Sequence, residues 1–355
     1  MDIRPWLLIV SILTCGAAHA ADERARFDAV YVEYRQHEED GNWQAALEAA
    51  EQSWQIGRRV FGEDNLNTAN LALNYGRLLN RFNQGEEAGE VLEPALDIYR
   101  DHYGKDGLEL VDLYMELGTA ARAEARPSLA SRHFDRAIDL VPDERVMLRA
   151  KLNLNAGAVL QGSKLGRDFT ETAWEIYSEQ VGKADVRTAL AALGLARYEM
   201  ASGDHDDARP LLEDAIAVFS NAGENSRQFE MVARAFMIKA LEELGESDEA
   251  TKHCRVIGQK APPDPDEKYL PIYKEMPRFP RRALDRRLSG WAVVEFTVDD
   301  AGFTRDHEIV ESSDTIFEDA ALTSAKSFRY APRFENGKPV ATHGVQNKVT
   351  FEVLD

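Results

Sequence analysis

Acidic, histidine and cysteine side chains stand close together at three places in the sequence where a metal site or a catalytic site could form. The run Asp204-His205-Asp206-Asp207 stands where a helix is expected to begin, and acidic residues there complement the helix dipole. His253 and Cys254 are adjacent, so on a helix their side chains diverge by about 100° and cannot face one metal. The run from Asp299 to Gly302 suits a turn between strands, because the later ligands of a calcium loop are missing.

Phosphate-binding glycine loops, nucleophile elbows and HExxH motifs are absent from the sequence. We therefore expect no catalytic residue, no cofactor and no metal, and a protein that is not an enzyme.

Composition excludes further classes of protein. The 355 residues include 62 acidic and 42 basic side chains, and the formal net charge is −20. This balance argues against binding of nucleic acid or of anionic membranes as the main function. Charged residues at 29% and hydrophobic residues at 44% are typical of a folded protein. Two cysteines, Cys15 and Cys254, are too few for a disulfide scaffold or a four-cysteine zinc site.

The first twenty residues have the pattern of an export signal. Arg4 precedes an apolar run from Trp6 to Thr14, and Ala18-His19-Ala20 fits a small-x-small cleavage site. The apolar run is well short of the roughly 20 residues that a membrane-spanning helix needs. We expect residues 1–20 to be a cleaved signal peptide and the protein to be periplasmic. The alternative is a protein that keeps this segment as an inner-membrane anchor and faces the periplasm.

Between about residues 22 and 258, small residues recur in pairs seven positions apart, which places both on one face of a helix. The first members of successive pairs are separated by 42, 42, 36, 42 and 42 residues. The pairs are Ala46/Ser53, Ala88/Ala95, Ala130/Ala137, Gly166/Ala173, Ala208/Ala215 and the looser Ala250/Ile257. Small residues also stand twelve positions before three of the pairs, at Gly76, Gly118 and Ala196. The spacing predicts about six helix pairs stacked into a solenoid whose helices approach closely at these residues.

This pattern resembles tetratricopeptide repeats (TPRs) in a longer form of about 42 residues. The 36-residue interval, Leu154 at an expected small position and a degenerate last repeat depart from the family pattern. The resemblance implies a concave surface that binds peptides or protein partners. Polar residues on the first helices of the pairs are the candidates for contact with a TPR ligand, namely Asn70, Asn74, Arg77, Asn153 and Arg197.

Proline changes the pattern after Ala261. The run Ala261-Pro262-Pro263-Asp264-Pro265 and three further prolines predict an extended linker over residues 261–276. Alternation then predicts strands over residues 291–298, 303–310 and 345–353. An amphipathic helix is expected over residues 317–328, and Asn336-Gly337 predicts a turn.

These residues resemble the C-terminal domain of TonB-family proteins over residues 275–355. The matching segments are Phe279 to Leu284, Gly290 with Val293 to Asp299, Gly302, Val310 to Ser313, Phe317 with Ala320 to Leu322, Phe328 to Pro332, Asn336 to Val340 and Val349 to Phe351. The resemblance implies a small α/β domain of three antiparallel strands and two helices. It also implies a periplasmic protein that pairs with the N-terminal box of TonB-dependent outer-membrane receptors.

Receptor docking of this kind needs no catalytic group, because an extended segment can add as a strand to a free sheet edge. The last strand is the expected edge, with Val345, Asn347, Val349, Thr350 and Phe351 as candidate partner-binding residues. By motif position, the segment Phe279, Pro280, Arg281 and Arg282 is also expected near the receptor. It belongs to a cluster of five arginines within residues 278–287.

The sequence thus predicts a signal peptide (1–20), a TPR-like domain (21–260), a linker (261–276) and a TonB C-terminal-like domain (277–355). The leading hypothesis is a protein that docks on TonB-dependent receptors, takes part in energy-dependent transport across the outer membrane, and recruits another protein through its repeats. The alternative is a periplasmic TPR scaffold whose TonB-like domain binds another envelope protein without a role in transport. A TonB energy transducer keeps an uncleaved membrane helix, which the cleavable segment expected here does not supply.

Overall fold

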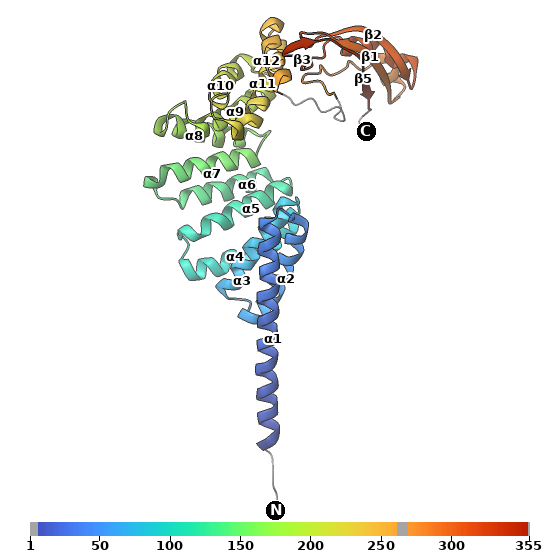
Figure 1. The fold of residues 1–355 in the computed structure, drawn as a ribbon. Helices are drawn as coiled ribbons and strands as arrows, with labels where there is room; N and C mark the ends of the chain where they lie inside the picture. The colour runs from blue at the N-terminus through green and yellow to red at the C-terminus, as the bar shows by residue number, and fades with distance from the viewer. Residues whose placement is uncertain (1–5, 261–268, 354–355) are drawn as a thin grey trace, which may run out of the picture. The chain divides into compact units, whose positions relative to one another are not determined.

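The computed structural model describes residues 6–260 and 269–353, with side chains from Ala21 onward. The chain divides into two compact units, Met1–Gln180 and Val181–Asp355. The first unit consists of four helix pairs, and Figure 1 shows their order along the chain. The pairs are α1 (Trp6–Glu39) with α2 (Trp43–Phe61), α3 (Leu66–Arg81) with α4 (Gly85–Tyr103), α5 (Val111–Ala123) with α6 (Pro127–Asp139), and α7 (Val146–Val159) with α8 (Lys164–Gln180).

Helix ends in this unit follow from local chemistry. The side chain of Asn65 accepts a hydrogen bond from the Asn67 N–H at 2.8 Å and so caps the start of α3. Gly62 and Gly104 follow α2 and α4 with φ of +97° and +80°, a backbone conformation that glycine adopts without strain. Their 42-residue separation therefore marks equivalent helix ends in successive repeats.

The paired helices approach each other at the small residues that the sequence pattern identified. A Cβ atom on Gly76 would lie 2.6 Å from Leu92, and one on Gly118 would lie 2.3 Å from the ring of Phe134. Ala88, Ala130 and their equivalents on the other second helices are fully buried. Since these contacts leave no room for a side chain, the periodic small residues are part of the helix–helix packing.

The fourth pair departs from this register, as its 36-residue interval suggests. Leu154, at the expected small position, is half-buried. Gly157, one helical turn later, makes the close approach instead, because a Cβ there would lie 2.1 Å from Thr170 Oγ1 and 3.0 Å from the Gly166 carbonyl oxygen. The small position in this repeat has therefore moved toward the end of α7.

The second unit begins with two more helix pairs, so the described chain contains the six pairs that the sequence predicts. They are α9 (Val186–Ser202) with α10 (His205–Phe219), and α11 (Arg227–Glu243) with α12 (Ser247–Lys260). Asp185 caps α9 by accepting a hydrogen bond from the Arg187 N–H at 2.9 Å.

A small α/β domain completes the second unit. Its sheet contains β1 (Gly290–Val298), β2 (Thr304–Ser312) and β5 (Thr342–Phe351), all antiparallel in the order β2-β1-β5. Helices α13 (Arg281–Asp285) and α14 (Glu318–Ala325) accompany it, which confirms the expected three strands and two helices. Alternate β1 residues, Ala292, Val294, Phe296 and Val298, are buried in the core of this domain.

Three details of this domain differ from the sequence prediction. Helix α14 ends at Ala325 rather than Phe328, because Phe328 and Tyr330 turn into the core on an extended segment. The last strand begins earlier, at Thr342. The Asn336-Gly337 turn, with φ of +51° and +76°, joins a two-stranded hairpin of β3 (Arg333–Glu335) and β4 (Lys338–Val340), where the sequence pattern predicts a turn alone.

The predicted linker is described only in its second half, because residues 261–268 lie outside the described residues. Tyr269 packs against the core of the C-terminal domain, with its ring centroid 5.0 Å from that of Tyr330. Tyr273 pairs with Arg329, whose N–H donates to the Tyr273 carbonyl oxygen at 3.0 Å. Residues 269–273 are therefore held on the folded domain.

The predicted signal segment is described in part. Residues 1–5 lie outside the described residues, and from Trp6 the backbone is helical and continues into the rest of α1. Within the described part of the chain, no helix has the length and apolar character that crossing a membrane requires.

A buried arginine joins the last helix pair to the C-terminal domain. Arg329 is 1% exposed and forms an ion pair with Glu242 of α11. Its Nη2 donates to Thr251 Oγ1 of α12 at 2.8 Å and to the Ala301 carbonyl oxygen at 3.2 Å. Its guanidinium carbon also lies 3.7 Å from the ring centroid of Phe303. One side chain of the C-terminal domain therefore bonds to both helices of the last pair.

Further contacts extend this junction. The Tyr273 hydroxyl donates to Glu243 Oε1 at 3.1 Å, and the hairpin strand β3 lies against α12 (Figure 1). A Cβ on Gly258 of α12 would lie 2.1 Å from the Pro332 carbonyl oxygen, so only glycine permits this approach. The C-terminal domain and the last helix pair thus share one interface of matched shape and charge.

Gly118→Ala tests the close approach of helices within a repeat. The added methyl group would overlap the Phe134 ring, so we expect the free energy of unfolding to fall by about 1–3 kcal/mol in urea titrations. Gly89→Ala is the matched control, because the nearest atom to its Cβ is 3.6 Å away. The control is expected to gain up to about 1 kcal/mol from helix propensity. Equal stability of the two variants would contradict the packing argument.

Arg329→Met tests the junction. The substitution leaves the Glu242 carboxylate without its buried partner, so we expect a loss of about 3–5 kcal/mol in urea unfolding. Glu242→Gln added to this variant should restore part of the loss, because no charge is then left unpaired.

Cys254 provides an independent readout of the same junction. It is fully buried beside Arg329, and burial raises the pKa of its thiol to about 11. In a Cys15→Ser background, iodoacetamide at pH 8 should label Cys254 slowly in the natural junction and faster in Arg329→Met. Unchanged stability together with unchanged labelling would show that Arg329 does not hold the junction.

Candidate partner-binding surfaces

Strand β5 forms one edge of the three-stranded sheet. Among the described residues it pairs only with β1, so its other side carries backbone groups without a strand partner. The register allows the direction of these groups to be assigned. The Trp291 N–H and carbonyl oxygen bond to Ser313, next to β2, at 2.8 and 2.9 Å, so they face away from β5. Thr350 is paired opposite Trp291, so its N–H and carbonyl oxygen face the open edge.

By the same alternation, Lys348 and Gln346 also present their backbone groups at the open edge, whereas Val349 bonds toward β1. The regular edge therefore offers backbone donors and acceptors at every second residue. This is the pattern that an added antiparallel or parallel strand requires.

The predicted partner-binding side chains of β5 divide between two faces. Val345, Val349 and Phe351 are buried in the domain core, so they position the strand and do not face a partner. Asn347 also points inward, and its Oδ1 accepts a hydrogen bond from Lys274 Nζ at 3.2 Å. Thr350 is exposed. What this strand offers a partner is mainly its backbone.

The residues from Phe279 to Arg282 differ in how far they are buried. Phe279 packs edge-to-face on Phe317 and Phe351, at centroid distances of 6.3 and 5.8 Å, and so belongs to the edge of the core. Pro280 is half-buried at the start of α13. Arg281 and Arg282 are exposed, and neither forms an ion pair within the described residues. The two arginines are thus the members of this predicted set that remain accessible.

Three predicted TPR-ligand residues lie together on α3 in the first unit. Asn70 and Asn74 line a cavity of about 430 Å³ with residues of α1, and Asn70 Oδ1 accepts a hydrogen bond from the Tyr99 hydroxyl. Arg77 is exposed and forms an ion pair of 3.1 Å with Glu116 of α5. These polar side chains lie on the side of α3 that faces α1 and α5, which are the first helices of the neighbouring pairs.

The other two predicted TPR-ligand residues behave differently. Asn153 is only 5% exposed, and its Nδ2 donates to the Arg149 carbonyl oxygen at 2.9 Å within α7. Little of this side chain is therefore accessible to a ligand, and its amide is already hydrogen-bonded inside its own helix. Arg197, in the second unit, is exposed and lies over the ring of Phe236 at 5.8 Å.

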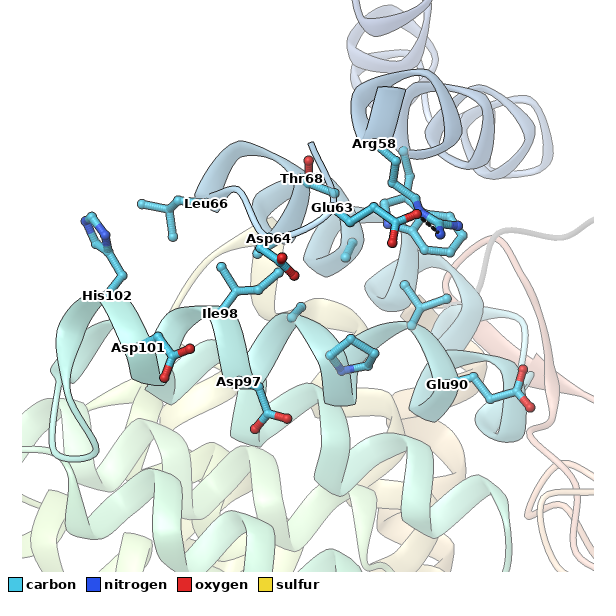
Figure 2. A pocket seen from close by; sticks show the side chains of 16 residues that line it. Arg58, Glu63, Asp64, Leu66, Thr68, Glu90, Asp97, Ile98, Asp101 and His102 are labelled. Atoms are coloured by element: carbon cyan, nitrogen blue, oxygen red, sulfur yellow. Dashed lines mark hydrogen bonds and ion pairs between the residues drawn. The ribbon is translucent and has the colours of Figure 1, made fainter. Parts of the chain in front are cut away.

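The first unit also contains an acidic groove between α2, the start of α3, and α4. It encloses about 670 Å³, and Figure 2 shows the carboxylates of Glu63, Asp64, Glu90, Asp97 and Asp101 around it. Glu63 is paired with Arg58 at 2.6 Å, and Asp97 with Arg100 at 3.1 Å. Part of the net negative charge of the chain is therefore located around this groove.

No group of three or more potential metal ligands comes together in the described residues. Burial lowers the pKa of His253 to about 4, with a further contribution from Arg234, whose Nη1 lies 3.1 Å from His253 Nδ1. Cys254 points into the junction, so the two neighbours diverge as helix geometry requires.

Comparison with known proteins agrees with these two structural parts. Residues 275–353 match the family described as Gram-negative bacterial TonB protein C-terminal, and residues 36–101 match tetratricopeptide repeats. None of the curated proteins matches the chain.

Solved structures resemble this chain over part of its length. BtubC from P. vanneervenii has 15% sequence identity and a TM-score of 0.50, covering 66% of this chain and 98% of its own. A Podosopora anserina chain with nearly identical TPR-like repeats has 18% identity and a TM-score of 0.44, covering 56% of this chain and 97% of its own. PilF of Pseudomonas aeruginosa has 15% identity and a TM-score of 0.43, covering 68% and 95%. The two family matches show that this chain carries tetratricopeptide repeats, which are protein-interaction repeats, followed by a TonB C-terminal domain.

Proposed function

We propose that this is a periplasmic protein whose TonB C-terminal domain docks on TonB-dependent outer-membrane receptors and takes part in energy-dependent transport. The observation that carries the proposal is the open edge of β5 within a domain that matches the TonB family. An extended receptor segment that pairs with this edge satisfies the outward N–H and carbonyl groups of Gln346, Lys348 and Thr350.

The repeats supply a second binding function in this proposal. The first-helix face of the first unit presents Asn70, Asn74 and Arg77, whose amide and guanidinium groups can bond to the backbone or carboxylates of a protein partner. A TPR region joined to a docking domain would bring that partner to the receptor. Binding of this kind requires no catalytic group or cofactor.

The second candidate function is a periplasmic scaffold whose TonB domain binds another envelope protein and has no role in transport. The cleavage pattern Ala18-His19-Ala20 favours it, because removal of residues 1–20 would also remove the segment that could reach an inner-membrane motor. The two candidates share the β5 edge and differ in the partner and in the fate of the N-terminus.

Thr350→Pro tests strand addition at β5. Proline removes the N–H that faces the open edge, so we expect a loss of at least tenfold in affinity for the N-terminal peptides of TonB-dependent receptors from the same genome. Fluorescence anisotropy with the full-length chain measures the affinity, and circular dichroism establishes that the variant is folded.

Thr350→Ala is the matched control, since it removes the same side chain and keeps the N–H. It should bind as the natural chain does. If folded Thr350→Pro binds receptor peptides normally, the docking surface lies elsewhere. If the natural chain binds no receptor peptide at high micromolar concentration, the receptor assignment is wrong.

Intact mass spectrometry of the protein from separated periplasmic and membrane fractions tests the compartment. We expect a mature chain that begins at Ala21 in the periplasmic fraction, because Ala20 ends the cleavage pattern. An intact N-terminus in the membrane fraction would contradict cleavage and would favour direct transmission of force from the inner membrane.

A further inference from the structure

A groove of about 750 Å³ runs along part of the β5 edge in the second unit. Residues 342–348 form one wall, and Tyr269, Leu270, Lys274 and Arg333 form the other. Leu270 is 65% exposed, so an apolar side chain stands open in the groove. Because Tyr269 is packed on the domain core, this second wall has a defined position beside the strand edge.

All the charged residues that line this groove are basic. They are Lys274, Arg333 and Lys348, and no aspartate or glutamate lines it. This is unusual in a chain with 62 acidic and 42 basic residues, and it contrasts with the five carboxylates of the acidic groove in the first unit. Within the described residues, no carboxylate oxygen lies within 4.0 Å of any of the three cations.

Each of these cations is held against an aromatic ring. Lys274 Nζ lies 5.2 Å from the Phe328 centroid, the Arg333 guanidinium 5.1 Å from that of Tyr269, and Lys348 Nζ 3.9 Å from that of Trp291. Such contacts place a cation without neutralising it. The groove therefore presents positioned positive charges that an anionic partner can neutralise.

The cations lie on both faces of the sheet. Lys274 donates to Asn347, whose side chain is on the core face, whereas Lys348 stacks on Trp291 on the opposite face. A strand added at the edge points successive side chains to opposite faces. Acidic side chains at neighbouring positions of an added strand can therefore each reach a cation.

We infer that this groove selects an acidic peptide in extended conformation, with the peptide backbone bonded to β5 and its carboxylates facing Lys274, Arg333 and Lys348. The inference deepens the proposed function and rests on it, since both use the β5 edge. Charge complementarity is the property that identifies the partner: backbone pairing accepts any extended segment, whereas the three cations favour carboxylates.

Three synthetic peptides test the inference on the full-length chain. They are ten-residue strands of alternating threonine and valine in which two neighbouring central positions carry glutamates, glutamines or lysines. We expect the glutamate peptide to bind about tenfold more tightly than the glutamine peptide, and the lysine peptide most weakly. The advantage of the glutamate peptide should shrink as salt rises from 50 to about 500 mM, because the ion pairs are exposed.

The variant Lys274→Glu/Arg333→Glu/Lys348→Glu should invert the order, so that the lysine peptide binds best. The milder Lys274→Gln/Arg333→Gln/Lys348→Gln should abolish the preference, and it provides the test if the reversed variant fails to fold. Lys239→Glu/Lys326→Glu/Lys338→Glu is the control, because it changes the net charge equally at exposed lysines outside the groove. It should keep the natural order.

The outcomes separate this inference from the proposed function. Equal binding of glutamate and glutamine peptides, with loss of both in Thr350→Pro, would overturn the acidic preference and leave docking at the edge intact. A charge-dependent preference without any binding of receptor peptides would support the inference and contradict the receptor assignment. Failure of all three peptides to bind the natural chain would overturn the inference.

Discussion

The close approach of paired helices at small residues is the constraint on which the repeat region depends. Gly76 and Gly118 leave no room for a side chain against Leu92 and Phe134, so the spacing of small residues fixes which helices pack together. The repeat survives a change of length because the small position can move by one turn, as Gly157 shows. Each repeat thereby keeps its packing while the polar residues on its outer faces are free to vary.

The C-terminal domain is held by a different kind of interaction. Arg329 is buried among groups of α11, α12 and its own domain, and a buried charge of this kind is costly unless all its neighbours are in place. The C-terminal domain and the last helix pair are therefore joined in the structure, although the sequence predicts a domain boundary between them. The position of the C-terminal domain on the last helix pair is fixed by Arg329 and by the close contact at Gly258.

The proposed docking surface combines backbone groups with charged side chains. The open edge of β5 supplies backbone hydrogen bonds that carry little sequence information. Beside it lie three cations, each set on an aromatic ring, and we infer that they favour acidic segments among the extended ones. The acidic groove of the first unit carries the opposite charge.

The sequence by itself determined the six helix pairs, the three strands and the helix that begins near Phe317, because periodic small residues and alternating apolar residues report local geometry directly. The second helix of the C-terminal domain was expected only from the resemblance to the TonB family. It also placed the β5 residues at the candidate surface, but it did not show which way their side chains and backbone groups point. The Val349 side chain faces the core, and only the pairing with Trp291 shows that the backbone N–H and carbonyl oxygen of Thr350 face the open edge. Asn153 could not be distinguished from its exposed neighbours until its amide was seen bonded within α7. Arg329 stands next to aromatic residues in a family motif, and nothing in that motif indicates a partner 87 residues earlier. The same holds for Lys274, Arg333 and Lys348, which are scattered in the chain and meet in one groove. Such contacts depend on distances between segments that are far apart in the chain, so only the tertiary structure decided them.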